Sequence, residues 1–347
     1  MKLTGHLIDS FEVNPMKNIS VVRRSLAGLG LLVLILDGGT AIVGMRMGIN
    51  VCIRTLIPSL FPFMILCSLI NGNSDGHTGR LLRGIGKFCH MSPGCESILV
   101  TGFLGGYPVG ARSVSALYDK GVITEDDARR MTVFCNNAGP SFLFGVLGSV
   151  FEDIKTIFLL WGVQILSALL MGHFLPFREN RKPNTHVSHS QSLSESLQSG
   201  IRVMGTICGW VILFRTVLEY LEKWIFSHIS LPLQILLTGM LELSNGCIAL
   251  PQIQNEFLRF LMASMMLSFG GICISLQTAS VCKKCIFKGY IRRKLLQCCV
   301  CIFISGLSFP LSRSFPFPLV ILLLISIPFL IDNIQKNTGF DKKEVAF

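Results

Sequence analysis

Long apolar runs separated by short polar stretches dominate the pattern of the chain. The first two cover about 26–43 and 51–70, and others follow at 154–174, 295–309 and 316–331. A helix of roughly 20 apolar residues is long enough to cross the hydrocarbon core of a membrane. The pattern therefore predicts an all-α polytopic membrane protein.

Four further apolar runs are interrupted by clusters of Gly, Pro, Asn or Ser. These runs cover 97–118, 131–150, 232–250 and 257–281. Backbone N–H and C=O groups cannot stay unpaired against lipid, so a broken helix at membrane depth must face protein or a water-filled cavity. The shorter arms of 97–118 and 232–250 suggest re-entrant hairpins. The runs 131–150 and 257–281 are interpreted as broken membrane-spanning helices.

The second half of the chain repeats the first in outline. Thr238-Gly-Met-Leu241 echoes Thr101-Gly-Phe-Leu104, and a polar break follows each motif. We predict an N-terminal tail and first transmembrane helix, a first repeat, a cytoplasmic linker, a second repeat, and a last transmembrane helix with its tail. These parts are expected at 1–47, 48–178, 179–199, 200–310 and 311–347.

The basic residues decide how the run 232–250 is interpreted. If that run crossed the membrane, the basic cluster 283–294 would move outside, which the positive-inside rule disfavours. If both hairpins return to their own side, each repeat crosses three times and the repeats are inverted. We therefore expect about eight transmembrane helices, two re-entrant hairpins and both termini in the cytoplasm.

Composition supports a membrane protein and excludes several other classes. Half of the 347 residues are hydrophobic, 15% are charged, and the mean hydropathy is +0.59. The net charge of +11 is explained by Lys and Arg in cytoplasmic loops, so the lipid bilayer is the expected partner and nucleic acid is not. No nucleophile–base pair, Walker loop or zinc motif is present, so we expect no enzyme activity, cofactor or metal.

Cysteine usage does not indicate a disulfide framework. The thirteen cysteines lack regular spacing and lie mostly in apolar segments, where a free thiol behaves as a small hydrophobe. The stretch 282–301 is rich in cysteine and could suggest a metal site, but its second half lies in an apolar run.

Charged residues at the hairpin tips are the first candidates for a binding site. In transporters built from inverted repeats, broken helices place the substrate near the bilayer midplane. Arg112, just past the first tip, could clamp a carboxylate with its planar guanidinium, or it could snorkel to the membrane surface. Glu242, at the second tip, would repel an anion. It is therefore assigned to a coupling cation, sodium or a proton.

Uncharged polar residues cluster at the four helix breaks. Such groups orient a polar solute, although hydrogen bonding between helices is the alternative role. The expected substrate-binding residues are Gly106, Tyr107, Pro108, Arg112, Asn136, Asn137, Ser141, Ser244, Asn245, Gly270 and Gln277.

Three motifs, taken in order, carry a family resemblance. They are Gly105-Gly-Tyr-Pro-Val-Gly-Ala-Arg112, Phe134-Cys-Asn-Asn-Ala-Gly-Pro140 and Ser268-Phe-Gly-Gly271. Together they resemble the YlbJ-type family of sporulation integral membrane proteins, which is grouped with the nucleoside-recognition, or Gate, domains related to concentrative nucleoside transporters. The cysteine-rich basic stretch 282–301 departs from what the family leads us to expect.

The resemblance implies a function in an endospore-forming bacterium. It implies a secondary transporter that carries dipicolinic acid, a small anionic metabolite, from the mother cell across the outer forespore membrane. The alternatives are a transporter of nucleosides or other small solutes, and a membrane scaffold for spore assembly that transports nothing. An oligomer is compatible with each of these functions.

Overall fold

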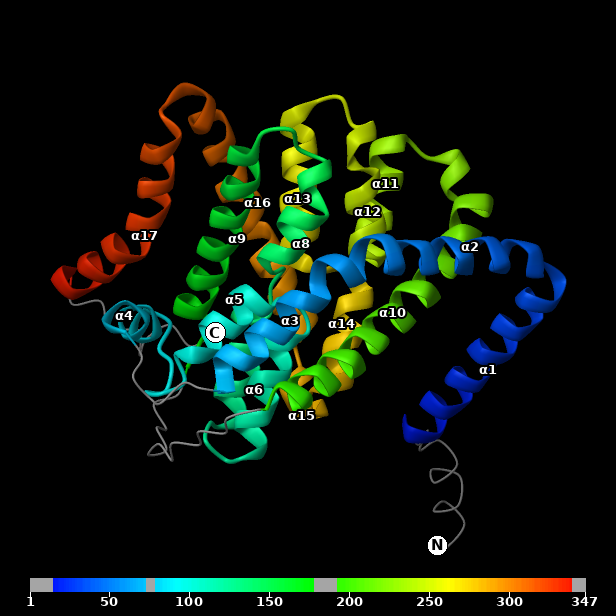
Figure 1. Cartoon of the computed structure of the whole chain (residues 1–347), viewed down its shortest axis with the longest axis horizontal. Helices are drawn as coiled ribbons and strands as arrows, with labels where there is room; N and C mark the ends of the chain where they lie inside the picture. The colour runs from blue at the N-terminus through cyan, green and yellow to red at the C-terminus, as the bar shows by residue number, and fades with distance from the viewer. Residues whose placement is uncertain (1–14, 73–78, 178–191, 339–347) are drawn as a thin grey trace, which may run out of the picture.

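The computed structural model describes residues 15–72, 79–177 and 192–338 (Figure 1). This part of the chain is helical and contains no strand, which confirms the prediction of an all-α polytopic membrane protein. Five of its helical stretches are long and apolar enough to cross a membrane. They are Gly38–Leu66, Ile154–Phe174, Leu193–Trp224, Glu256–Val281 and Lys284–Ser314.

The first helices differ from the sequence prediction. Helix α1 covers Pro15–Leu36, and α2 begins at Gly38 and ends at Val51. The predicted end of the first apolar helix near Gly44 is therefore inside α2. The break falls at Asp37 instead, because its carboxylate caps α2 by accepting a hydrogen bond from Thr40 N (3.4 Å).

The chain continues from α2 without a break through a π-helical turn, Cys52–Leu56, into α3, Ile57–Gly72. Helix α2 lies along α10, Leu193–Trp224 (Figure 1). Gly44 and Gly48 of α2 allow this close approach, because a Cβ on Gly44 would lie 2.7 Å from Thr216 Cα of α10. The pair α2–α10 forms one wall of the molecule.

A helix ends and another begins within each of the four predicted broken runs. In 97–118 and 232–250 the two arms pack against each other. The helices before and after the four breaks are α5 (Ser97–Gly105) and α6 (Val109–Asp119), α7 (Glu125–Phe134) and α8 (Pro140–Gly145), α11 (Leu231–Leu241) and α12 (Leu243–Ala249), and α13 (Glu256–Phe269) and α14 (Gly271–Val281). The membrane side to which each hairpin returns stays a prediction.

The first hairpin packs directly on an unwound backbone segment. Residues 135–139 join α7 to α8 without helical structure. Gly102 and Gly110 face this segment, and a Cβ on either would lie only 2.0 or 1.9 Å from Cys135 O. Each of the two positions therefore accepts only glycine. The backbone of the hairpin lies in direct contact with the backbone of the broken helix.

The remaining helices surround these elements. Helix α9 (Ile154–Phe174) packs against α13 and α16 (Tyr290–Ser314), and α17 (Phe317–Thr338) lies at the opposite edge of the molecule from α1 (Figure 1). The helices α4 (Arg80–Phe88) and α15 (Lys284–Phe287) are short. Residues 179–191 of the predicted linker lie outside the described residues. The rest of the linker is helical from Leu193, where Ser192 and Glu195 form a capping box.

Candidate functional site

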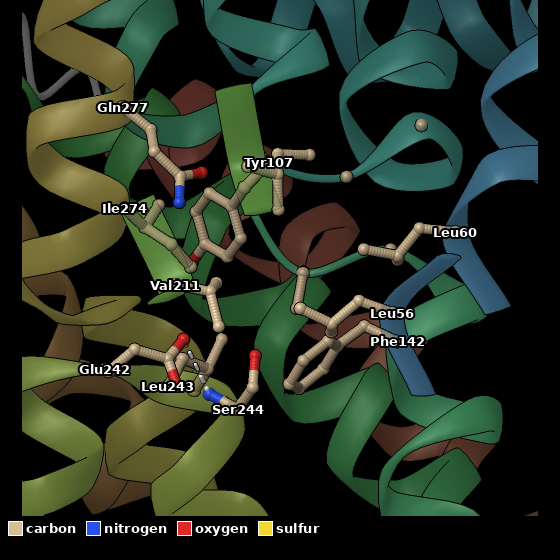
Figure 2. Close-up of a pocket in the computed structure, with 15 residues that line it drawn as sticks. Leu56, Leu60, Tyr107, Phe142, Val211, Glu242, Leu243, Ser244, Ile274 and Gln277 are labelled. Atoms are coloured by element: carbon tan, nitrogen blue, oxygen red, sulfur yellow. Dashed lines mark hydrogen bonds between the residues drawn. The ribbon is translucent and has the colours of Figure 1, made fainter. Parts of the chain in front are cut away.

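The helix breaks converge on a small internal cavity. Its lining comes from the first hairpin tip, the segment 138–142, the second hairpin tip and α14, together with α10, the end of the π-helical turn and α3. Figure 2 shows Tyr107, Gln277 and Glu242 on one side of it, and Leu56, Leu60 and Phe142 on the other. The volume is about 40 Å³. That space holds a few water molecules, whereas a metabolite site usually needs roughly 300 Å³ or more.

Glu242 supplies a carboxylate to the cavity wall although its side chain is almost wholly buried, with 1% exposed. The carboxylate accepts hydrogen bonds from Ser244 N (3.2 Å), Asn245 N (2.8 Å) and Asn245 Nδ2 (2.6 Å). No ion pair joins it to any Lys or Arg of the described residues. Glu242 therefore caps α12 itself, and the backbone N–H groups there are already occupied.

Tyr107 connects the first hairpin tip to the second repeat. Its hydroxyl donates a hydrogen bond to Leu267 O of α13 (2.7 Å), and its ring lines the cavity. Gly270 has a left-handed backbone (φ +81°), and a Cβ there would lie 3.1 Å from the Tyr107 ring. Gly106 and Tyr107 therefore line the cavity, and Gly270 lies beside Tyr107 without being part of the lining.

Asn136 and Asn137 are fully buried in the unwound segment behind the cavity wall. Asn136 Nδ2 donates to Thr278 Oγ1 and to Tyr290 Oη, both at 3.0 Å. The Asn136 side chain therefore links the first repeat to the second. This is the helix-to-helix role that the sequence left open as the alternative to substrate binding.

Lys294 lies at this site, which the sequence did not predict. The sequence predicts it in the basic cytoplasmic cluster 283–294. In the structure it lies in the second turn of α16 with 0% of its side chain exposed. Its Nζ donates to Asn136 O (2.8 Å), Asn137 Oδ1 (3.2 Å) and Gln297 Oε1 (2.9 Å). The Tyr107 ring centroid is 5.4 Å away. One signal was available in the sequence, since Lys294 and Gln297 are three residues apart and share a helix face.

The comparison with known proteins agrees with this architecture. The chain is 25% identical over 300 residues to the sporulation integral membrane protein YlbJ of Bacillus subtilis (strain 168), and the match covers 73% of each chain. The predicted resemblance to the YlbJ-type membrane family is confirmed. No protein-family model and no solved structure matches the chain. The relation to Gate domains stays a prediction.

Arg112 does not lie at the cavity, although the sequence suggested that it could clamp a substrate carboxylate. Its side chain is exposed, does not line the cavity, and donates from Nη1 to Ser199 Oγ of α10 (3.0 Å). Pro108 and Ser141 are buried next to cavity-lining residues but are not part of the lining. Ser244 and Gln277 do line it, while Asn245 contacts it through Glu242.

A second and larger hollow runs along the same elements. It has a volume of about 430 Å³ and is lined from the π-helical turn and α3, from the end of α8 and its following turn, and from α12. Arg54 is the charged residue in its lining, with the hydroxyls of Thr55, Ser59 and Ser149. A hollow with a cation and no carboxylate in its lining favours anions.

The cysteines of the stretch 282–301 take part in helix packing. Cys298 Sγ lies 3.6 Å from Met265 O, and Cys301 Sγ lies 3.6 Å from Ser264 O, so both face α13. Cys282 Sγ lies 3.6 Å from Ala111 O of the first hairpin. These contacts give Cys282, Cys298 and Cys301 a packing role between helices.

Proposed function

We propose that the chain is a secondary transporter that moves a small anionic metabolite across a membrane during sporulation. Dipicolinic acid, carried across the outer forespore membrane, is the first candidate because the family resemblance implies it. The observation that supports transport most strongly is a cavity with a buried carboxylate that is lined by three helix breaks and by α14, the helix that follows the fourth break. Breaks and charges at membrane depth are costly, and transporters use both to form their sites.

The cavity lies between two groups of helices. Its lining comes from Leu56, Leu60 and Phe142 on one side, and from Tyr107, Gln277 and Glu242 on the other (Figure 2). Movement of one group against the other would enlarge the space of about 40 Å³ until it holds a solute. Alternating access to the two membrane faces would follow from the same movement.

Two cationic groups favour an anionic solute. Arg54 faces the larger hollow, which we propose as the entrance, and Lys294 lies behind Tyr107 at the inner cavity. Tyr107 and Phe142 offer aromatic faces to a planar ring such as that of dipicolinate. Glu242, which repels anions, is proposed to bind the coupling cation, sodium or a proton.

The test is uptake by vesicles that contain only the purified protein. Radiolabelled dipicolinate should enter these vesicles faster than protein-free vesicles, and unlabelled dipicolinate should compete. In the source organism, deletion should give spores low in dipicolinate while the mother cell still makes it. Normal dipicolinate in spores of the deletion strain would refute the proposal.

Nucleoside transport is a second candidate, supported by the aromatic side chains of Tyr107 and Phe142 in the cavity wall. It predicts that uridine or adenosine competes in the same vesicle assay. A scaffold without transport is favoured by the small cavity volume and by the internal hydrogen bonds of Asn136. It predicts that Asn137→Ala and Glu242→Gln variants that reach the membrane still support spore formation.

A further inference from the structure

The ammonium of Lys294 is enclosed by neutral oxygen atoms. Its three N–H donors are matched by three acceptors, which are the main-chain carbonyl of Asn136 and the side-chain amide oxygens of Asn137 and Gln297. The described residues provide no Asp or Glu within ion-pair distance of it. The site therefore binds a cation without neutralising it.

The acceptors are held in position by the break between α7 and α8. Because α7 ends at Phe134, the carbonyl of Asn136 is free of helical hydrogen bonding. Asn137 is oriented twice, since its Nδ2 donates to Phe134 O (2.7 Å) and its Oδ1 accepts from Gln297 Nε2 (2.9 Å). The oxygen cage formed by Asn136, Asn137 and Gln297 is thus a built site.

These three oxygen atoms are ligands of the kind that binds a monovalent metal cation. Unwound main-chain carbonyls coordinate sodium in transporters with broken helices, and hard cations prefer oxygen ligands. The Tyr107 ring at 5.4 Å adds a cation–π attraction. A lysine here costs several kcal/mol more than an apolar side chain would, so filling the space does not explain it.

We propose that Lys294 is a built-in cation, whose tethered ammonium occupies an oxygen cage that would otherwise bind sodium. The cage therefore keeps the unwound segment joined to α16 at every sodium concentration. Any dissociable coupling ion then acts elsewhere, at Glu242. This deepens the proposed transport function, although its test does not require transport.

The experiment measures the thermal unfolding temperature, Tm, of purified protein in detergent micelles. Each variant is measured in choline chloride, sodium chloride and propylammonium chloride at equal ionic strength. Lys294→Ala leaves the cage empty, and propylammonium matches the atoms that this change removes. Lys294→Met fills the space without a charge. Lys288→Ala, which changes an exposed lysine nearby, is the matched control.

For the wild-type protein and Lys288→Ala, we expect the same Tm in all three salts. Lys294→Ala should have a lower Tm in choline, and sodium or propylammonium should raise it saturably, by about 2 °C at ten times the Kd. Lys294→Met should not respond, because its side chain occupies the cage.

A saturable rise in the Tm of the wild-type protein with sodium would overturn the proposal. So would a Lys294→Ala protein that responds to neither cation, or one that fails to fold in all three salts, because an added cation should restore the cage. None of these results depends on uptake. Failure here would therefore leave the transport proposal standing, and absence of uptake would leave the built-in cation standing.

Discussion

Gly110→Ala tests the backbone contact between the first hairpin and the broken helix. The added Cβ would lie 1.9 Å from Cys135 O, whereas real Cβ contacts essentially never fall below 3.0 Å, so the groups must separate by at least 1.1 Å (3.0 − 1.9). The same Cβ would also lie 2.9 Å from Cys135 C and 3.1 Å from Gly102 Cα, which leaves no free direction for the shift. We expect a loss of about 3 kcal/mol or more of unfolding free energy.

That loss corresponds to a fall in Tm of roughly 4 °C or more for a chain of this size. The assay is thermal unfolding of the purified variant in detergent, followed by intrinsic fluorescence. Gly205→Ala is the control, because a Cβ at Gly205 of α10 meets nothing within 4 Å. Its Tm should stay level or rise slightly, since alanine favours a helix. A Gly110→Ala protein as stable as the wild type would refute the packing described for the first hairpin.

Three further predictions concern single side chains and topology. Arg112→Lys should leave uptake unchanged, because Arg112 is exposed and outside the cavity; a tenfold loss of substrate affinity in vesicle uptake would return it to the site. Arg54→Gln should raise the KM for uptake several-fold with kcat unchanged. The difference in KM from the wild type should shrink in high salt, because exposed charges are screened. Equal KM values at low salt would exclude Arg54 from the entrance. Cysteines placed at 195 and 288 should react with an impermeant reagent from the same, cytoplasmic side, and labelling from opposite sides would contradict the inverted repeat.

The helix breaks could be predicted because their causes are local. Pro140 cannot donate a backbone hydrogen bond, and Gly270 adopts a left-handed conformation that other residues avoid. The break at Asp37 had a local signal as well, an N-cap followed by Gly-Gly-Thr, but the apolar residues on both sides outweighed it in the sequence analysis. A local cause therefore makes a break predictable only where long apolar runs on both sides do not mask it.

The positions of the charged side chains could not be predicted in the same way. Lys294 is buried because it meets Asn136 and Asn137, which lie 158 and 157 residues earlier in the chain. Arg112 is exposed because the first hairpin turns it toward Ser199 of α10, away from the cavity. These outcomes depend on which helices pack together, and hydropathy gives no information on that.

The most direct test of the proposed transport site compares dipicolinate uptake by wild-type and Glu242→Gln protein in vesicles, under imposed sodium and proton gradients. Glutamine keeps the size of Glu242 but removes its charge, and its NH₂ group would face one of the donors from Ser244 or Asn245. The account predicts that one of the two gradients drives wild-type uptake, and that Glu242→Gln protein takes up dipicolinate without responding to that gradient. Gradient-driven uptake by Glu242→Gln equal to that of the wild type would contradict it.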